Sequence, residues 1–249
     1  MKVSLFITCL IDNFYPSVGE AVVDILNRCG VEVDFPEQQT CCGQPAFNSG
    51  YADEARTVAT TLLDAFSESE YVVTASGSCA GMVRHYYSDL FRADPRRARQ
   101  AADLAQKTYE FSQFMVRVLG SPPLNARFPH RVTYHPSCHG SRLLGVRDEP
   151  LQLLSQVADL QLVDLPYADD CCGFGGTFSI KMADLSTAMV TEKAAHVVET
   201  GAEVLVSGDM GCLMNIGGRL RHEGRAVRVM HLAELLHEGI LLAEGEKTR

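Results

Sequence analysis

Two series of four cysteines run through this chain of 249 residues, and the second repeats the spacing of the first. Each series has a single cysteine, then a Cys-Cys-Gly triplet, then another single cysteine. The gaps are 31 and 36 residues in the first series and 32 and 39 in the second. Self-similarity over this distance indicates duplication of a whole domain rather than a short solenoid repeat. The cysteines are Cys9, Cys41, Cys42 and Cys79, followed by Cys138, Cys171, Cys172 and Cys212.

Apolar segments repeat together with the cysteines. Short β-rich runs alternate with stretches of helical periodicity. This alternation predicts parallel βαβ units, so we expect an α/β fold with two similar Rossmann-like halves and parallel sheets. Expected strands span residues 2–8, 31–35, 71–75, 131–135, 160–164 and 203–207, and expected helices span residues 17–29, 52–66, 95–119 and 183–200.

A stop signal after the last helical stretch of the first half predicts the boundary between the halves. Gly120 ends that stretch, and Pro122 and Pro123 do not continue a helix. We therefore expect a first cysteine-rich half at residues 1–121 and a second at residues 122–249.

The expected strands place all eight cysteines at one kind of location. The single cysteines come at or just past the C-terminal ends of strands, and both Cys-Cys-Gly triplets lie in loops after other strands. Open α/β sheets bind ligands at that edge, where helix N-termini favour anions such as thiolates. Gly43 and Gly173 are expected at positive φ, which leaves room for a bulky group.

Composition and charge exclude several partners. The net charge of −9 repels phosphate backbones, so nucleic acid is not an expected partner. No apolar stretch reaches about 18 residues, so no transmembrane segment is expected, and no small-residue cleavage site follows the first apolar run. An α/β chain with these features is expected in the cytoplasm, where clustered cysteines bind metal or carry out redox chemistry.

Eight clustered cysteines can hold iron–sulfur clusters, bind zinc or form redox disulfides. Structural zinc usually takes cysteines with about two to four residues between them, whereas adjacent cysteines reach one ion awkwardly. In a cluster, adjacent cysteines can each bind a different iron. Four cysteines also complete the protein ligation of a four-iron cluster. The pattern therefore favours iron–sulfur clusters, with one 4Fe–4S cluster per half as the simplest expectation and zinc as the alternative.

The doubled series resembles the cysteine-rich CCG-domain family. That family includes the heterodisulfide reductase B subunit, the iron–sulfur subunit of glycolate oxidase and the lactate-utilisation protein A type. The resemblance covers nearly the whole chain and is greatest to the lactate-utilisation type. It is carried there by Phe6-Ile7-Thr8-Cys9-Leu10-Ile11-Asp12 and by Ser76-Gly77-Ser78-Cys79-Ala80-Gly81-Met82. The extra ferredoxin-type cysteines of the glycolate oxidase subunit are absent from this sequence.

The resemblance implies that the chain works with other subunits of an iron–sulfur complex. That complex would oxidise L-lactate, a small 2-hydroxy acid, to pyruvate. One departure matters, because the heterodisulfide reductase motif ends in Cys-x-x-Cys, and here Ser76 and Asp209 take the first of those positions. Four cysteines per half remain instead of five, which argues against the non-cubane clusters and disulfide cleavage of that enzyme. Ser76 and Asp209 are expected to form a hydrogen bond or to contact solvent rather than to ligate iron.

Four further side chains near the series are also considered. His135 and His139 flank Cys138 and either ligate iron in place of a cysteine, donate an N–H to a cluster sulfur or serve the fold alone, and with four cysteines available N–H donation is favoured over ligation. Arg142 either binds a substrate carboxylate, caps a helix or balances cluster charge. Cys29 lies outside both series, late in an expected amphipathic helix, which favours burial over metal binding.

The leading functional hypothesis is an iron–sulfur electron-transfer subunit of an oxidoreductase complex. The sequence carries no flavin or nicotinamide fingerprint, so lactate oxidation is expected to need partner subunits. A thiol–disulfide reductase subunit and a zinc-stabilised, non-catalytic scaffold are the alternatives. Metal and sulfide content separates the scaffold from the other two, and substrate tests separate those.

Overall fold

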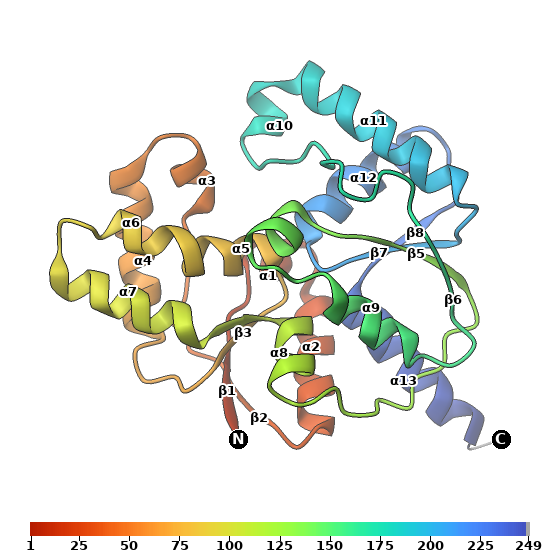
Figure 1. Ribbon diagram of the computed structural model, residues 1–249, viewed down its shortest axis with the longest axis horizontal. Coiled ribbons are helices and arrows are strands. Elements are labelled where there is room, and N and C mark those ends of the chain that lie inside the picture. The colour runs from red at the N-terminus through yellow and green to blue at the C-terminus, as the bar shows by residue number, and fades with distance from the viewer. Residues whose placement is uncertain (248–249) are drawn as a thin grey trace.

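Each half of the molecule contains one four-stranded sheet, as the computed structural model of residues 1–247 shows (Figure 1). The strand orders are β2-β1-β3-β4 and β6-β5-β7-β8, so the second sheet repeats the topology of the first. The strands of the first sheet are β1 (Lys2–Leu5), β2 (Glu32–Asp34), β3 (Val72–Thr74) and β4 (Thr108–Glu110), and those of the second are β5 (Arg131–His135), β6 (Gln161–Val163), β7 (Val204–Ser207) and β8 (Arg228–His231).

Every strand pair in both sheets is parallel, and the registers correspond. Val3 pairs with Val33 in the first sheet, and Val132 pairs with Leu162 in the second. The apolar strands β3 and β7 are buried along their whole length, as expected for parallel sheets covered on both faces. The predicted α/β fold with two Rossmann-like halves is therefore confirmed.

Helices connect the strands within each half. Pro16 starts α2 at a position where its missing N–H leaves no unsatisfied hydrogen bond, and Val18, Val22 and Ile25 bury one face of that helix. No helix within residues 1–247 is long and apolar enough to cross a membrane. The helices of the first half are α1 (Cys9–Phe14), α2 (Pro16–Arg28), α3 (Gln44–Asn48), α4 (Ala52–Ala65), α5 (Gly77–Gly81), the π-helical η1 (Met82–Tyr86), α6 (Tyr87–Leu90), α7 (Pro95–Lys107) and α8 (Phe111–Arg117). Those of the second half are the π-helical η2 (His139–Leu143), α9 (Asp148–Ser155), α10 (Phe178–Lys181), α11 (Ala183–Glu199), α12 (Met210–His222) and α13 (Leu232–Lys247).

The expected helix at residues 95–119 is wrong, because a strand interrupts it. Residues Thr108–Glu110 leave the helical conformation and pair with β3, where Thr108 lies opposite Val72. Tertiary pairing therefore overrides the helical pattern of the flanking residues. The side chain of Glu110 then accepts a hydrogen bond from the backbone N–H of Gln113 and starts α8. The fourth strand of the second half, β8, was not anticipated either.

One hydrophobic cluster extends across both halves. Buried residues of both sheets, including Leu5, Val73, Val132 and Leu205, belong to one contiguous apolar cluster. The C-terminal helix α13 packs along α2 of the first half, and α5 packs against η2 (Figure 1). The C-terminal edges of the two sheets consequently meet at one seam inside the molecule.

Candidate metal centre

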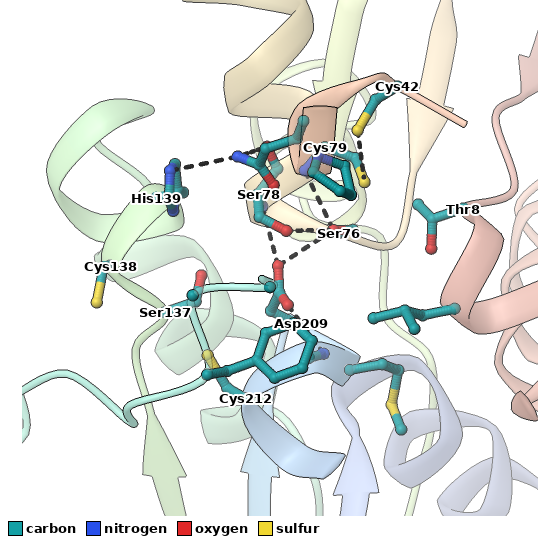
Figure 2. Close-up of a pocket in the computed structure, with 18 of the residues that line it drawn as sticks. Thr8, Cys42, Ser76, Ser78, Cys79, Ser137, Cys138, His139, Asp209 and Cys212 are labelled. Carbon is teal, nitrogen blue, oxygen red and sulfur yellow. Dashed lines mark hydrogen bonds between the residues drawn. The ribbon is translucent and has the colours of Figure 1, made fainter. Parts of the chain in front are cut away.

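All eight cysteines of the two series line one cavity of about 260 Å³ between the halves. Figure 2 shows Cys42 and Cys79 from the first half on one side of this cavity and Cys138 and Cys212 from the second half on the other. The two series are therefore close in space as well as alike in sequence. The polar side chains that line this cavity include Thr8, Gln44, Asn48, Ser76, Ser78, Ser137, His139 and Asp209.

The four cysteines of the first half form a connected group of thiols. The sulfur atoms of Cys42 and Cys79 lie 3.4 Å apart. Cys41 forms hydrogen bonds with both Cys42 and Cys9. The backbone N–H of Gly43 donates to the Cys41 sulfur over 3.4 Å. Three separate segments, namely the first turns of α1 and α5 and the loop before α3, thus bring four sulfur atoms together.

The four cysteines of the second half repeat this arrangement. Cys171 forms hydrogen bonds with Cys138 and Cys172, and Cys172 forms one with Cys212. The backbone N–H of Gly173 donates to the Cys171 sulfur over 3.4 Å. The convergence of each series within its own half is what the spacing predicts.

In each half, the first cysteine of the triplet carries the most acidic thiol. Hydrogen bonds from Cys42 and then Cys9 lower the pKa of Cys41 to about 3. Hydrogen bonds from Cys138 and then Cys172 lower the pKa of Cys171 to about 2. A thiol that donates such a hydrogen bond becomes less acidic. The bond to Cys41 thus raises the pKa of the Cys9 thiol. Each set therefore favours a thiolate at the first cysteine of its triplet.

The two triplet glycines adopt the left-handed conformation that the sequence predicts. Gly43 has φ +81° and Gly173 has φ +80°. A Cβ atom at Gly43 would lie 3.1 Å from the carbonyl oxygen of Ala55, and one at Gly173 would lie 2.8 Å from that of Ser186. Both positions therefore need glycine for conformation and for close approach to α4 and α11, respectively.

The last cysteine of each series lies in the first turn of a helix that follows a strand. Ser76 caps α5 by accepting from the backbone N–H of Cys79, and Asp209 caps α12 by accepting from that of Gly211. The free N–H groups and dipoles of helix N-termini favour negative charge. The last cysteine of each series therefore lies just past the C-terminal end of a strand, as the sequence predicts.

Asp209 also joins the two halves. Its Oδ2 atom accepts from the hydroxyl of Ser76 over 3.1 Å and from the backbone N–H of Ser78 over 2.9 Å (Figure 2). One carboxylate therefore caps a helix in its own half and the equivalent helix of the other half. The sequence predicts a hydrogen bond or solvent contact at each of these two positions, and it does not predict that they bond to each other. The sequence does show that the two positions are equivalent, because Ser76 lies three residues before Cys79 and Asp209 lies three residues before Cys212.

The two histidines beside Cys138 occupy different surroundings. His135 is fully buried, and one of its ring nitrogens lies within 4.8 Å of the sulfur atoms of both Cys172 and Cys212. Burial, and then the charge of Lys193, lower the pKa of His135 to about 4. His139 instead lines the cavity, where its Nε2 lies 3.3 Å from the Gln44 side-chain nitrogen (Figure 2).

Two other residues singled out in the sequence lie away from the thiols. Cys29 packs partly buried against the shared core, and burial raises the pKa of its thiol. The guanidinium of Arg142 donates to the backbone carbonyl of Asp169, in the loop before the second triplet. Arg142 therefore holds this loop in place, and it is not among the residues that line the cavity.

The donor set fits a thiolate-bound metal group. Soft sulfur ligands select iron–sulfur clusters or zinc over hard cations such as magnesium. Each half supplies four sulfur atoms, and the backbone N–H groups of Gly43 and Gly173 already donate to those of Cys41 and Cys171. The residues present are therefore those that a four-iron cluster in each half would require.

Comparison with known proteins gives one family and a group of full-length relatives. The CCG family model, described as a cysteine-rich domain, matches residues 3–84 and 132–217. Lactate utilization protein A 2 of Bacillus cereus (strain AH820) is 54% identical over 240 residues, covering 96% of this chain and 99% of that protein. Lactate utilization protein A of Oceanobacillus iheyensis is 56% identical over 237 residues, covering 95% and 97%.

Solved structures resemble the chain only weakly. Glutamate racemase isoform RacE1 from Bacillus anthracis aligns over 98% of this chain and 82% of its own, with a TM-score of 0.39 and 10% sequence identity. That likeness is too weak to bear on fold or function.

Proposed function

Since this chain belongs to the cysteine-rich CCG-domain family, we propose that it is an iron–sulfur electron-transfer subunit of a lactate-utilising complex. Full-length relatives that are 54% and 56% identical carry the name lactate utilization protein A. In this proposal the complex oxidises L-lactate to pyruvate. The chain forms two cysteine-rich halves, residues 1–121 and 122–249.

One observation carries the proposal, namely that two sets of four cysteines converge on one cavity. We assign Cys9, Cys41, Cys42 and Cys79 to one 4Fe–4S cluster, and Cys138, Cys171, Cys172 and Cys212 to a second. The adjacent cysteines of each triplet favour a multi-iron group over a single zinc ion, because each can bind a different iron. The lowered pKa values of Cys41 and Cys171 supply thiolate donors at neutral pH.

The proposed role is electron relay, with substrate chemistry on a partner subunit. Oxidation of a 2-hydroxy acid to a 2-oxo acid removes two electrons and two protons, which normally requires a two-electron cofactor placed against the substrate. An iron–sulfur cluster generally transfers one electron at a time. Two sites on the same cavity allow the chain to hold both electrons of one turnover.

Metal analysis of the full-length chain tests the cofactor assignment. Protein purified without oxygen and reconstituted with iron and sulfide is expected to hold about eight irons and eight sulfides per chain. Stoichiometric zinc without sulfide would instead support the zinc-stabilised scaffold. The measurement is iron, zinc and acid-labile sulfide per chain. Oxygen is excluded throughout because air exposure alone can destroy a cluster.

An activity assay tests the role in lactate oxidation. The cluster-loaded chain alone is expected to show no L-lactate oxidation with an artificial electron acceptor, and activity is expected once its co-purifying partner subunits are added. Robust oxidation by the isolated chain would make it the catalytic subunit. Rapid reduction of a disulfide substrate, with no response to lactate in any combination, would support the thiol–disulfide alternative.

A further inference from the structure

His135 is a buried imidazole with no hydrogen-bond partner. It is 0% exposed, and neither of its ring nitrogens finds a partner among the described residues. A ring nitrogen lies within 4.8 Å of the sulfur atoms of Cys172 and Cys212. A neutral imidazole carries one N–H, and a buried donor without an acceptor is destabilising. The position of the ring indicates that its acceptor belongs to whatever the cysteines hold.

The first half has no such donor at the equivalent position. His135 lies three residues before Cys138, and the residue three before Cys9 is Phe6. Phe6 is 1% exposed and packs edge-on against Phe66. The two halves therefore place a hydrogen-bond donor and a hydrocarbon ring at matching sites beside their cysteines.

Lys193 adds a second difference of the same kind. It projects from α11 and is 1% exposed, and its ammonium donates to the carbonyl oxygens of Tyr167 and Ala168 over 2.5 and 3.4 Å. Burial lowers its pKa, and the negative charge of Asp170, followed by the thiols of Cys172 and Cys138, acts in the opposite direction. An ammonium group has three N–H donors, so one donor remains after these two carbonyl oxygens are bound.

The first half carries a leucine where the second carries this lysine. Helices α4 and α11 can be compared residue by residue. The reference points are Ala55 and Ser186, which lie against the triplet glycines of their own halves. Counting seven residues onward gives Leu62 in α4 and Lys193 in α11. Leu62 is 1% exposed and lies in a hydrophobic cluster of the first half. The buried cation is therefore particular to the second half.

We propose that the two clusters have unequal reduction potentials, with the second-half cluster the more easily reduced, because His135 and Lys193 stabilise its added negative charge. The inference rests on the proposed iron–sulfur function. His135 donates its N–H to a cluster sulfur, and Lys193 contributes a buried positive charge nearby. Neither residue is a ligand in this proposal. Both act by stabilising the more negative, reduced state of the cluster.

Two general effects give the proposal its direction. Hydrogen bonds to the sulfur atoms of a cluster, and its net charge environment, are among the factors that set its potential. A positive charge interacts more strongly with a nearby anion in a buried site than in water, because the surroundings screen it less. Reduction transfers one electron to the cluster from the partner subunit, whose redox cofactor is oxidised by one electron, and no bond forms or breaks. The first electron to enter the chain should therefore reside on the second-half cluster.

The test is an anaerobic redox titration of the full-length, cluster-loaded chain followed by electron paramagnetic resonance. Cys42→Ser, which keeps only the second-half set intact, and Cys172→Ser, which keeps only the first, assign the two signals. His135→Phe and Lys193→Leu install the residues of the first half. At a fixed potential, each should lower the reduced-to-oxidised ratio of the second-half cluster about tenfold and leave the first unchanged.

A control and a second readout keep the proposal falsifiable. His222→Phe removes an exposed histidine at the end of α12 and should change neither potential. If His135→Phe does not fold, nitrogen hyperfine spectra of wild-type protein with ¹⁵N-labelled histidine provide the answer. A weakly coupled nitrogen at the second-half cluster, retained in His139→Leu, supports the hydrogen bond.

Three results would overturn the inference. These are equal potentials of the two clusters, potentials unmoved by both substitutions, or a strongly coupled nitrogen that marks His135 as a ligand. All three presuppose clusters, so they leave the proposed function standing. Absence of iron and sulfide after reconstitution would defeat the proposed function itself.

Discussion

The two halves agree in the backbone around their cysteines and differ in the polar side chains at the seam between them. The triplet glycines have φ values of +81° and +80°. At the seam, however, Ser76 of the first half faces Asp209 of the second. The last residue of the fourth strand is Glu110 in the first half and His231 in the second.

The difference follows from how a duplicated domain packs on itself. Identical halves that meet at the same edge would place like groups together. Two carboxylates at the positions of Ser76 and Asp209 would repel across hydrogen-bond distance, whereas a hydroxyl donates to a carboxylate. The cysteine scaffold can thus remain equal in both halves, while the seam requires two complementary partners.

The largest expected effect tests whether the two metal sets are independent. Cys42→Ser should remove about half of the iron and sulfide, and Cys172→Ser should remove the other half, because each cluster takes four ligands from one half. The measurement is metal and sulfide per chain after anaerobic reconstitution. Cys29→Ser should retain the full content, since Cys29 does not line the cavity. Loss of both clusters from one single substitution, in a folded protein, would contradict the two-set arrangement.

The sequence predicts the repeated part of the molecule and misses the part that depends on contact between the repeats. Spacing alone predicted that Cys41 and Cys171 meet their partners, because strand ends fix where each loop begins. The Asp209 bridge to Ser76 depends on the relative orientation of the halves, which a repeat pattern does not encode. Lys193 was missed because a lysine in a helix is usually exposed. Strand β4 was missed because its three residues need β3 beside them.

The second prediction concerns stability against pH and compares Glu110 with His231. Both side chains cap the next helix, since Glu110 accepts from the N–H of Gln113 and His231 Nδ1 accepts from that of Ala233, each over 3.1 Å. Burial raises the pKa of Glu110 from 4.5 to about 7 and lowers the pKa of His231 below its usual 6.5. Both side chains are thereby driven towards their neutral forms.

The signs of the two contributions are opposite. The native state holds the Glu110 proton more tightly than the unfolded state, so this contribution is present below pH 4.5 and is lost as pH rises to about 7. The contribution of neutral His231 is present above pH 6.5 and is lost as pH falls. Glu110→Gln should therefore raise the free energy of unfolding at pH 8 by up to about 3 kcal/mol, and His231→Gln should flatten the decline on the acid side.

Urea unfolding of the metal-free chain across the range from pH 5 to about pH 8 measures both contributions. Glu20→Gln, at an exposed position of α2, serves as the matched control for loss of one carboxylate. A wild-type and a Glu110→Gln profile that run parallel over this range would show that the carboxyl group of Glu110 titrates normally.

The smallest predicted effect compares the two helix caps that meet at the seam. Asp209→Ala removes the acceptor for the Ser76 hydroxyl, the Ser78 N–H and the Gly211 N–H, and it should cost about 2–3 kcal/mol of unfolding free energy. Ser76→Ala leaves Asp209 with its two backbone donors and should cost about 1 kcal/mol. Because the two residues share one hydrogen bond, the double variant should be less destabilised than the sum of the two single variants. Denaturant unfolding of the four proteins gives this coupling, and strict additivity would mean that the contact between Ser76 and Asp209 does not hold the halves together.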